Sequence, residues 1–129
     1  MDESMRYRKG MKARRAVLGN AYVDRAESRK NAFNAPFQDF ITRYAWGEVW
    51  TRPGLPRKIR SLITIGMMVA LNRPDELRLH LRSAVKIGVS RKEIQEVLLQ
   101  SAVYCGVPAA NSAFHIAEEV FNESAKKGQ

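Results

Sequence analysis

The chain has 129 residues, which fits one domain around one hydrophobic core, and its single cysteine excludes an internal disulfide and a paired-cysteine redox motif. With 22 Lys and Arg against 13 Asp and Glu, the formal charge of +9 favours an anionic partner, either a nucleic acid or a small polycarboxylate. The longest apolar run, residues 62–71, is too short to span a membrane, and residues 1–19 contain no secretory apolar segment. We therefore expect one domain covering residues 1–129, with no membrane association and a cytoplasmic location.

Helices are predicted throughout the chain, because no segment alternates apolar and polar residues as a half-buried strand does. The first predicted helix covers about residues 3–18 and ends near Gly19. The second begins near Asn34, which we expect to cap it, with Pro36 in its first turn. A connection rich in Pro and Gly follows this second helix.

The third predicted helix opens at Pro56, and its sequence IRSLITIGMMVAL, residues 59–71, is apolar nearly all round. Such a pattern predicts a helix at the buried centre of the fold. A break at Asn72–Pro74 precedes the fourth helix, and Gly88 is a suitable residue to follow its last turn.

The fifth predicted helix opens with a capping box formed by Ser90 and Glu93. A sixth helix runs from about Pro108 to about Ser124. The order of these elements predicts an all-α, single-domain helical bundle of about six helices.

Glu76 and His80 are the first candidates for chemistry, in a chain with only two histidines. They are four residues apart on the fourth predicted helix, so their side chains share one face. A carboxylate can hold one imidazole nitrogen and leave the other free for proton transfer near neutral pH. The same spacing is common in surface ion pairs, so the spacing alone leaves both interpretations open.

Arginines and tryptophans gather before and within the third predicted helix. Arg52 and Arg60 lie on either side of its start, and Trp46 and Trp50 precede it. Guanidinium groups bind carboxylates in a bidentate manner, and a tryptophan wall beside them would suit a small, planar, anionic ligand. Arginine and tryptophan also pack at subunit interfaces, and the pattern does not separate these two uses.

Other reactive residues are weaker candidates. The second histidine, His115, has polar neighbours at helical spacing and provides no third metal ligand beside Glu76 and His80, so we expect no metal site. Cys105 lies on the apolar face of the fifth predicted helix, where a packed thiol is expected. Aromatic residues do not interleave with the basic ones as a stacking platform requires, so no nucleic-acid site is expected. A basic helical binding module nevertheless stays as an alternative.

Five motifs occur in an order that resembles the carboxymuconolactone decarboxylase family. They are WTRPGL, RSLITI, ELRLHLR, GVSRKEIQEVLLQ and YCGVPAANSAFH, and the resemblance covers nearly the whole chain. The resemblance implies an all-helical fold similar to alkylhydroperoxidase D and assembly into a homo-oligomer, a trimer or a hexamer. It also implies a lyase without a cofactor, which converts a small anionic lactone, 4-carboxymuconolactone, into 3-oxoadipate enol-lactone and carbon dioxide in protocatechuate degradation. A family member acting on another lactone or acid is the main alternative.

The resemblance also suggests roles for particular residues. Peroxidase relatives carry Cys-x2-Cys-x3-His on the equivalent helix; here His80 matches the histidine, whereas Arg73 and Glu76 stand at the cysteine positions. Disulfide chemistry is therefore not expected, and His80 becomes the expected proton donor, oriented by Glu76. The residues expected to bind the substrate are two arginine clamps, three aromatic wall residues and a second candidate for proton relay: Arg52, Arg60, Trp46, Trp50, Tyr104 and Glu48.

Overall fold

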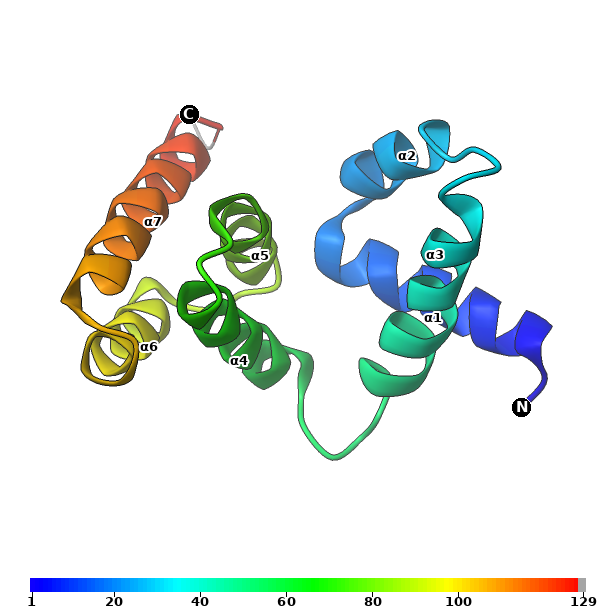
Figure 1. Cartoon of the computed structure of the whole chain (residues 1–129), viewed down its shortest axis with the longest axis horizontal. Helices are drawn as coiled ribbons and strands as arrows, with labels where there is room; N and C mark the ends of the chain where they lie inside the picture. The colour runs from blue at the N-terminus through cyan, green and yellow to red at the C-terminus, as the bar shows by residue number, and fades with distance from the viewer. Residues whose placement is uncertain (128–129) are drawn as a thin grey trace. The chain divides into compact units, whose positions relative to one another are not determined.

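The computed structural model describes residues 1–127, which form two compact units divided after Arg57. The described residues contain helices and no strand, so the predicted all-α class is confirmed (Figure 1). They form seven α-helices and one π-helix, rather than about six helices. None of these helices combines the length and the apolar character that crossing a membrane requires.

The first unit contains α1 (Glu3–Leu18), α2 (Asn20–Ser28), α3 (Ala35–Phe40) and the π-helix η1 (Ile41–Val49). The end of α1 lies where it was predicted, because Gly19 adopts a positive φ of 91° that favours glycine. The chain then re-enters helix at once, and the resulting α2 was missed. No side chain caps its start, so the usual sequence signal for a new helix is absent there.

The predicted capping role of Asn34 is wrong. Its side-chain oxygen accepts the backbone N–H of Asn31 at 2.9 Å, and its amide donates to the carbonyl of Arg29 at 3.1 Å. Both bonds point back into the preceding turn, and no side-chain hydrogen bond caps α3. Pro36 does lie in the first turn of α3, as predicted.

Two glycines let α1 and η1 approach each other backbone to backbone. A Cβ on Gly10 would lie 1.8 Å from the carbonyl oxygen of Thr42, and a Cβ on Gly47 would lie 2.5 Å from that of Arg6. Both distances are far below van der Waals contact. The position of η1 on α1 therefore depends on the absence of side chains at these two residues.

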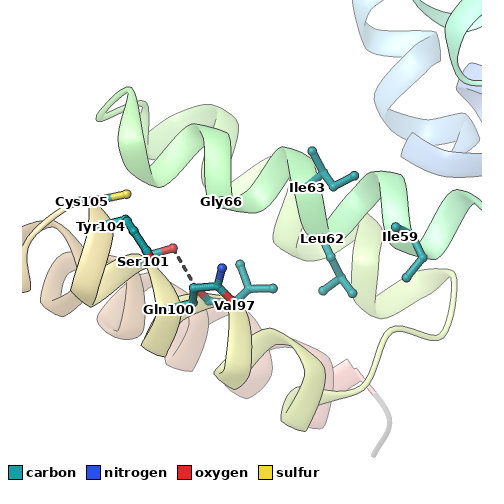
Figure 2. Close-up of a pocket in the computed structure, with 9 residues that line it drawn as sticks. All are labelled: Ile59, Leu62, Ile63, Gly66, Val97, Gln100, Ser101, Tyr104 and Cys105. Carbon is teal, nitrogen blue, oxygen red and sulfur yellow. Dashed lines mark hydrogen bonds between the residues drawn. The ribbon is translucent and has the colours of Figure 1, made fainter. Parts of the chain in front are cut away.

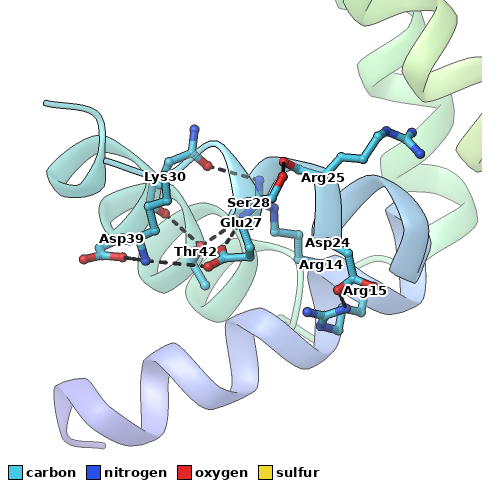
Figure 3. A network of polar contacts seen from close by, with 10 residues as sticks. Arg14, Arg15, Asp24, Arg25, Glu27, Ser28, Lys30, Asp39 and Thr42 are labelled. Atoms are coloured by element: carbon cyan, nitrogen blue, oxygen red, sulfur yellow. Dashed lines mark hydrogen bonds and ion pairs between the residues drawn. The ribbon is translucent and has the colours of Figure 1, made fainter. Parts of the chain in front are cut away.

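A network around a buried arginine links the elements of the first unit (Figure 3). Arg14 is only 3% exposed and donates to Gln38 at 3.2 Å and Thr42 at 3.5 Å, with the carboxylate of Glu27 at 3.7 Å. Lys30 continues the network, since its ammonium lies 3.8 Å from Glu27. These contacts connect α1 with α2, α3 and η1.

The second unit contains α4 (Arg57–Ala70), α5 (Pro74–Lys86), α6 (Arg91–Tyr104) and α7 (Val107–Lys127). Side chains from all four helices form its core, the largest fully buried ones being Ile65, Leu81, Ile94, Leu98 and Val120. Two ion pairs also join α5 to α7, from Arg78 to Glu119 and from Arg82 to Glu123.

Local signals at the ends of these helices are confirmed. Gly88 follows the last turn of α5 with a φ of 91°. The Glu93 backbone donates to the Ser90 hydroxyl at 3.0 Å, and the Ser90 backbone donates to the Glu93 carboxylate at 2.9 Å. These hydrogen bonds lower the pKa of Glu93. The last helix, α7, extends past Ser124 to Lys127.

The prediction that the third helix lies at the buried centre of the fold is wrong for this chain. Only Ser61, Ile65 and Val69 of α4 are buried. The opposite face carries Ile63, which is 42% exposed, and Met67, which is 55% exposed. The other helices of this unit cover one side of α4, so its second apolar face lacks a partner within the unit.

Candidate active site

The predicted site residues divide between the two units, and each group is described by itself. The first unit holds Trp46, Glu48, Trp50 and Arg52, and the second holds Arg60, Glu76, His80 and Tyr104.

His80 lies at the edge of the buried face of α5, which is formed by Leu77, Leu81 and Ala84. The imidazole is half-buried, and its Nδ1 atom is shielded from solvent and has no hydrogen-bond partner. Burial lowers the pKa of His80, and the charge of Glu76 opposes this effect in part. At neutral pH the imidazole is therefore mainly uncharged.

Glu76 occupies the first turn of α5, where a carboxylate interacts favourably with the helix dipole. Its side chain is exposed. The sequence suggested that this carboxylate orients the imidazole of His80. The Nδ1 atom of His80 makes no hydrogen bond, however, so Glu76 influences this atom through its charge.

The two tryptophans stack on each other, with ring centroids 4.8 Å apart and ring planes 28° apart. Trp46 is the inner ring, at 6% exposure, and Trp50 is half-buried. The two residues are four apart at the C-terminal end of η1, a spacing that places their side chains on one face. The π-helical winding continues to Trp50, whose backbone N–H donates to the carbonyl of Ala45 five residues earlier. The structure thus brings the two predicted wall residues together.

Glu48 and Arg52 follow the same segment. The carboxylate of Glu48 lies 3.5 Å from a terminal nitrogen of Arg6, which anchors it to α1. Arg6 also pairs with Glu3 and lies over the ring of Tyr44, 5.2 Å from its centroid. Arg52 is exposed just after η1, and its backbone N–H donates to Val49.

In the second unit, an apolar groove of about 410 Å³ lies between α4 and α6 (Figure 2). Tyr104, which is 83% exposed, and Cys105 lie at one end of this groove. The thiol of Cys105 is half-buried and packs against the core, as expected. No charged residue lines the groove, and neither Arg60 nor His80 does. The groove was not predicted from the sequence. Gly66, which has no side chain to fill the space toward Val97, was the available signal for it.

Metal ligands do not gather within the described residues: no three side chains among His, Cys, Asp and Glu could together hold an ion. His115 is exposed on α7. The chemistry available to the predicted residues is therefore that of a shielded imidazole, carboxylates, guanidinium groups and aromatic surfaces.

Comparisons with known proteins point to one family. The family model described as "Carboxymuconolactone decarboxylase family" matches residues 35–119. The 4-carboxymuconolactone decarboxylase of Acinetobacter baylyi is 50% identical over 123 residues, which cover 95% of this chain and 92% of that protein. The nitrosuccinic acid decarboxylase of Metarhizium robertsii is 43% identical over 120 residues, which cover 93% of this chain and 84% of that protein.

Proposed function

Because this chain belongs to the carboxymuconolactone decarboxylase family, we propose that it is a carbon–carbon lyase that converts 4-carboxymuconolactone into 3-oxoadipate enol-lactone and carbon dioxide. The observation that carries this proposal is the 50% identity, over nearly the whole length of both chains, to a relative named for that reaction. The matched region, residues 35–119, extends across both compact units, which supports one functional domain over residues 1–129. The proposal includes a cytoplasmic role in protocatechuate degradation and requires no cofactor.

The substrate itself dictates what the protein must do. The departing carboxylate is attached to the ring carbon γ to the lactone carbonyl. When carbon dioxide leaves, its bonding electrons move through the ring double bond onto the carbonyl oxygen and form an enolate. One proton must then be added at the α carbon. The overall reaction consumes one proton and releases one carbon dioxide.

His80 is the proposed proton donor to the α carbon. Burial keeps its imidazole mainly uncharged in the free protein, so it must first take up a proton. The negative charge of a bound dianionic substrate would favour the imidazolium, as Glu76 already does in part. Substrate binding and proton uptake would then be coupled at this residue.

The other predicted residues would bind the substrate. Arg52 or Arg60 would hold its acetate group, since a guanidinium forms two parallel hydrogen bonds to a carboxylate. Trp46, Trp50 and Tyr104 would provide a poorly hydrated wall beside the departing carboxylate. Glu48, held by Arg6 at 3.5 Å, is a second candidate for proton relay.

We also propose that the protein is a homo-oligomer, a trimer or a hexamer. The uncovered apolar face of α4 supports this, together with three residues at the α6–α7 turn: Val103, Tyr104 and Val107 are 76%, 83% and 70% exposed. Large exposed apolar side chains that gather on a surface are typical of interaction sites. The absence of charge in the α4–α6 groove also suits self-association of a chain with a net charge of +9.

The direct test is an assay for loss of the lactone absorbance with release of carbon dioxide, without added metal or nucleotide. His80→Ala should lower kcat by about 10²-fold or more if His80 transfers the proton. The matched control, His115→Ala, removes the exposed histidine and should keep full activity. Full turnover by His80→Ala would remove His80 from the mechanism.

A second candidate function is decarboxylation of a different acid, which the 43% identity to the nitrosuccinic acid decarboxylase favours. Comparing kcat/KM for 4-carboxymuconolactone and nitrosuccinate on the same preparation separates the two. A higher value for nitrosuccinate would replace the leading proposal.

A further inference from the structure

A second groove, separate from the predicted catalytic and substrate-binding residues, lies between α6 and α7. Its volume of about 450 Å³ falls within the range of small-ligand sites. Its inner surface is apolar, with the rings of Phe114 and Phe121 beside Leu98 and Ala117. Its charged lining residues are Arg91, Lys92 and Glu118.

Arg91 is held at the groove by an aromatic contact. The central carbon of its guanidinium lies 4.7 Å from the centroid of the Phe121 ring, within the range of a cation–π contact. A cation–π contact uses none of the N–H hydrogen bonds of the guanidinium, so these groups stay available for a bidentate acceptor. Within residues 1–127, no ion pair joins Arg91 or Lys92 to a carboxylate.

The charge around the groove limits the ligand. The charged residues that line the groove are two cations, Arg91 and Lys92, and one carboxylate, Glu118. The lining therefore has a surplus of one positive charge. A monoanion balances this surplus, whereas a dianion would add repulsion from Glu118. The half-buried rings of Phe114 and Phe121 favour a flat aromatic body next to that single charge.

We propose that the α6–α7 groove binds an aromatic monocarboxylate of about the size of benzoate. The carboxylate meets the edge of Arg91, with Lys92 nearby, and the aromatic ring packs against Phe114 and Leu98. This site is distinct from the proposed decarboxylase residues and does not depend on the decarboxylase activity.

The test is a titration of the full-length ¹⁵N-labelled protein with benzoate, followed by NMR. Saturable shifts are expected for amides near residues 91–95 and 114–121. Benzamide, which has the same shape without the charge, should bind at least about tenfold more weakly, because it forms no charge-assisted hydrogen bond. Arg91→Gln should weaken benzoate binding by a similar factor. Arg25→Gln, which neutralises an exposed arginine of α2, should leave the binding unchanged.

Three outcomes would overturn the proposal. They are equal binding of benzamide and benzoate, unchanged benzoate binding by Arg91→Gln, and shifts confined to residues outside α6 and α7. Hexanoate tests the aromatic requirement: if it bound as tightly as benzoate, the assignment of an aromatic ligand would be wrong. Since the readout is binding, a failure of the decarboxylase assay would not affect this result.

Discussion

Two glycines in helix interiors should respond in opposite ways to the same substitution. Gly10 lies within α1, where a Cβ would be 1.8 Å from the Thr42 carbonyl oxygen and 2.9 Å from the backbone nitrogen of Gly47. Gly66 lies within α4, where the nearest atom to a Cβ is a methyl carbon of Val97 at 3.7 Å, an ordinary contact. Alanine therefore meets fixed backbone at the first position and fits at the second.

The expected free energies follow from these distances. Alanine is favoured over glycine in a helix by about 1 kcal/mol, and this gain applies to both substitutions. Overpacking costs about 1–3 kcal/mol. The cost for Gly10→Ala should lie near about 3 kcal/mol, because the clashing atoms belong to the backbone and cannot move to another rotamer. Gly10→Ala should therefore lower the free energy of unfolding by about 2 kcal/mol. Gly66→Ala should raise it by up to about 1 kcal/mol.

Thermal and urea unfolding followed by circular dichroism measure both effects. The Tm should fall by about 10 °C for Gly10→Ala and rise by a few degrees for Gly66→Ala. The reasoning would be refuted if Gly10→Ala were as stable as the natural chain, since α1 and η1 would then not be in backbone contact. A loss of stability in Gly66→Ala would contradict the ordinary contact of a Cβ with Val97.

Three further predictions use other features of the chain. Arg14→Ala should lower the free energy of unfolding by about 3 kcal/mol because it removes both the buried partner of Glu27 and the volume of a side chain that is 3% exposed, whereas Arg14→Met refills most of that volume and should be milder in the same urea experiment. The pKa of His80 is lower in the folded chain than in the unfolded chain, so the unfolded chain binds more protons near about pH 6. The free energy of unfolding should therefore fall as the pH drops through about 6.5. His80→Gln should reduce this pH dependence of urea unfolding, and an unchanged dependence would assign it to other groups. Ile63→Asp, on the exposed face of α4, should yield smaller assemblies by sedimentation if that face is an interface, while an unchanged mass would exclude it.

The parts of the fold that could be predicted from sequence are those set by a few neighbouring residues. The capping box of Ser90 and Glu93, the positive φ at Gly88 and the end of α1 at Gly19 each depend on local backbone chemistry. The placement of Glu76 and His80 on one helix, four residues apart, was predicted for the same reason, since helical spacing alone fixes their faces.

The parts that could not be predicted depend on distant contacts. Both polar groups of the Asn34 side chain form hydrogen bonds with the backbone of the preceding turn. The helix cap expected from its residue type therefore does not form. The apolar face of α4 has no partner within its unit, and a sequence pattern cannot show whether a second surface covers it. The contact of Arg6 with Glu48 joins residues on different helices, which no spacing rule links.

The π-helix has a consequence for how this part of the protein tolerates insertions and deletions. A π-turn holds about one residue more than an α-turn. Removing one residue between Ile41 and Val49 would therefore let one π-turn become an ordinary α-turn, with the side chains on either side of the deletion close to their present directions. If the deletion falls between Trp46 and Trp50, the two residues become three apart, a spacing that still shares one helix face. This segment should therefore tolerate the loss of one residue better than an ordinary α-helix, in which the same deletion rotates all later side chains by about 100°.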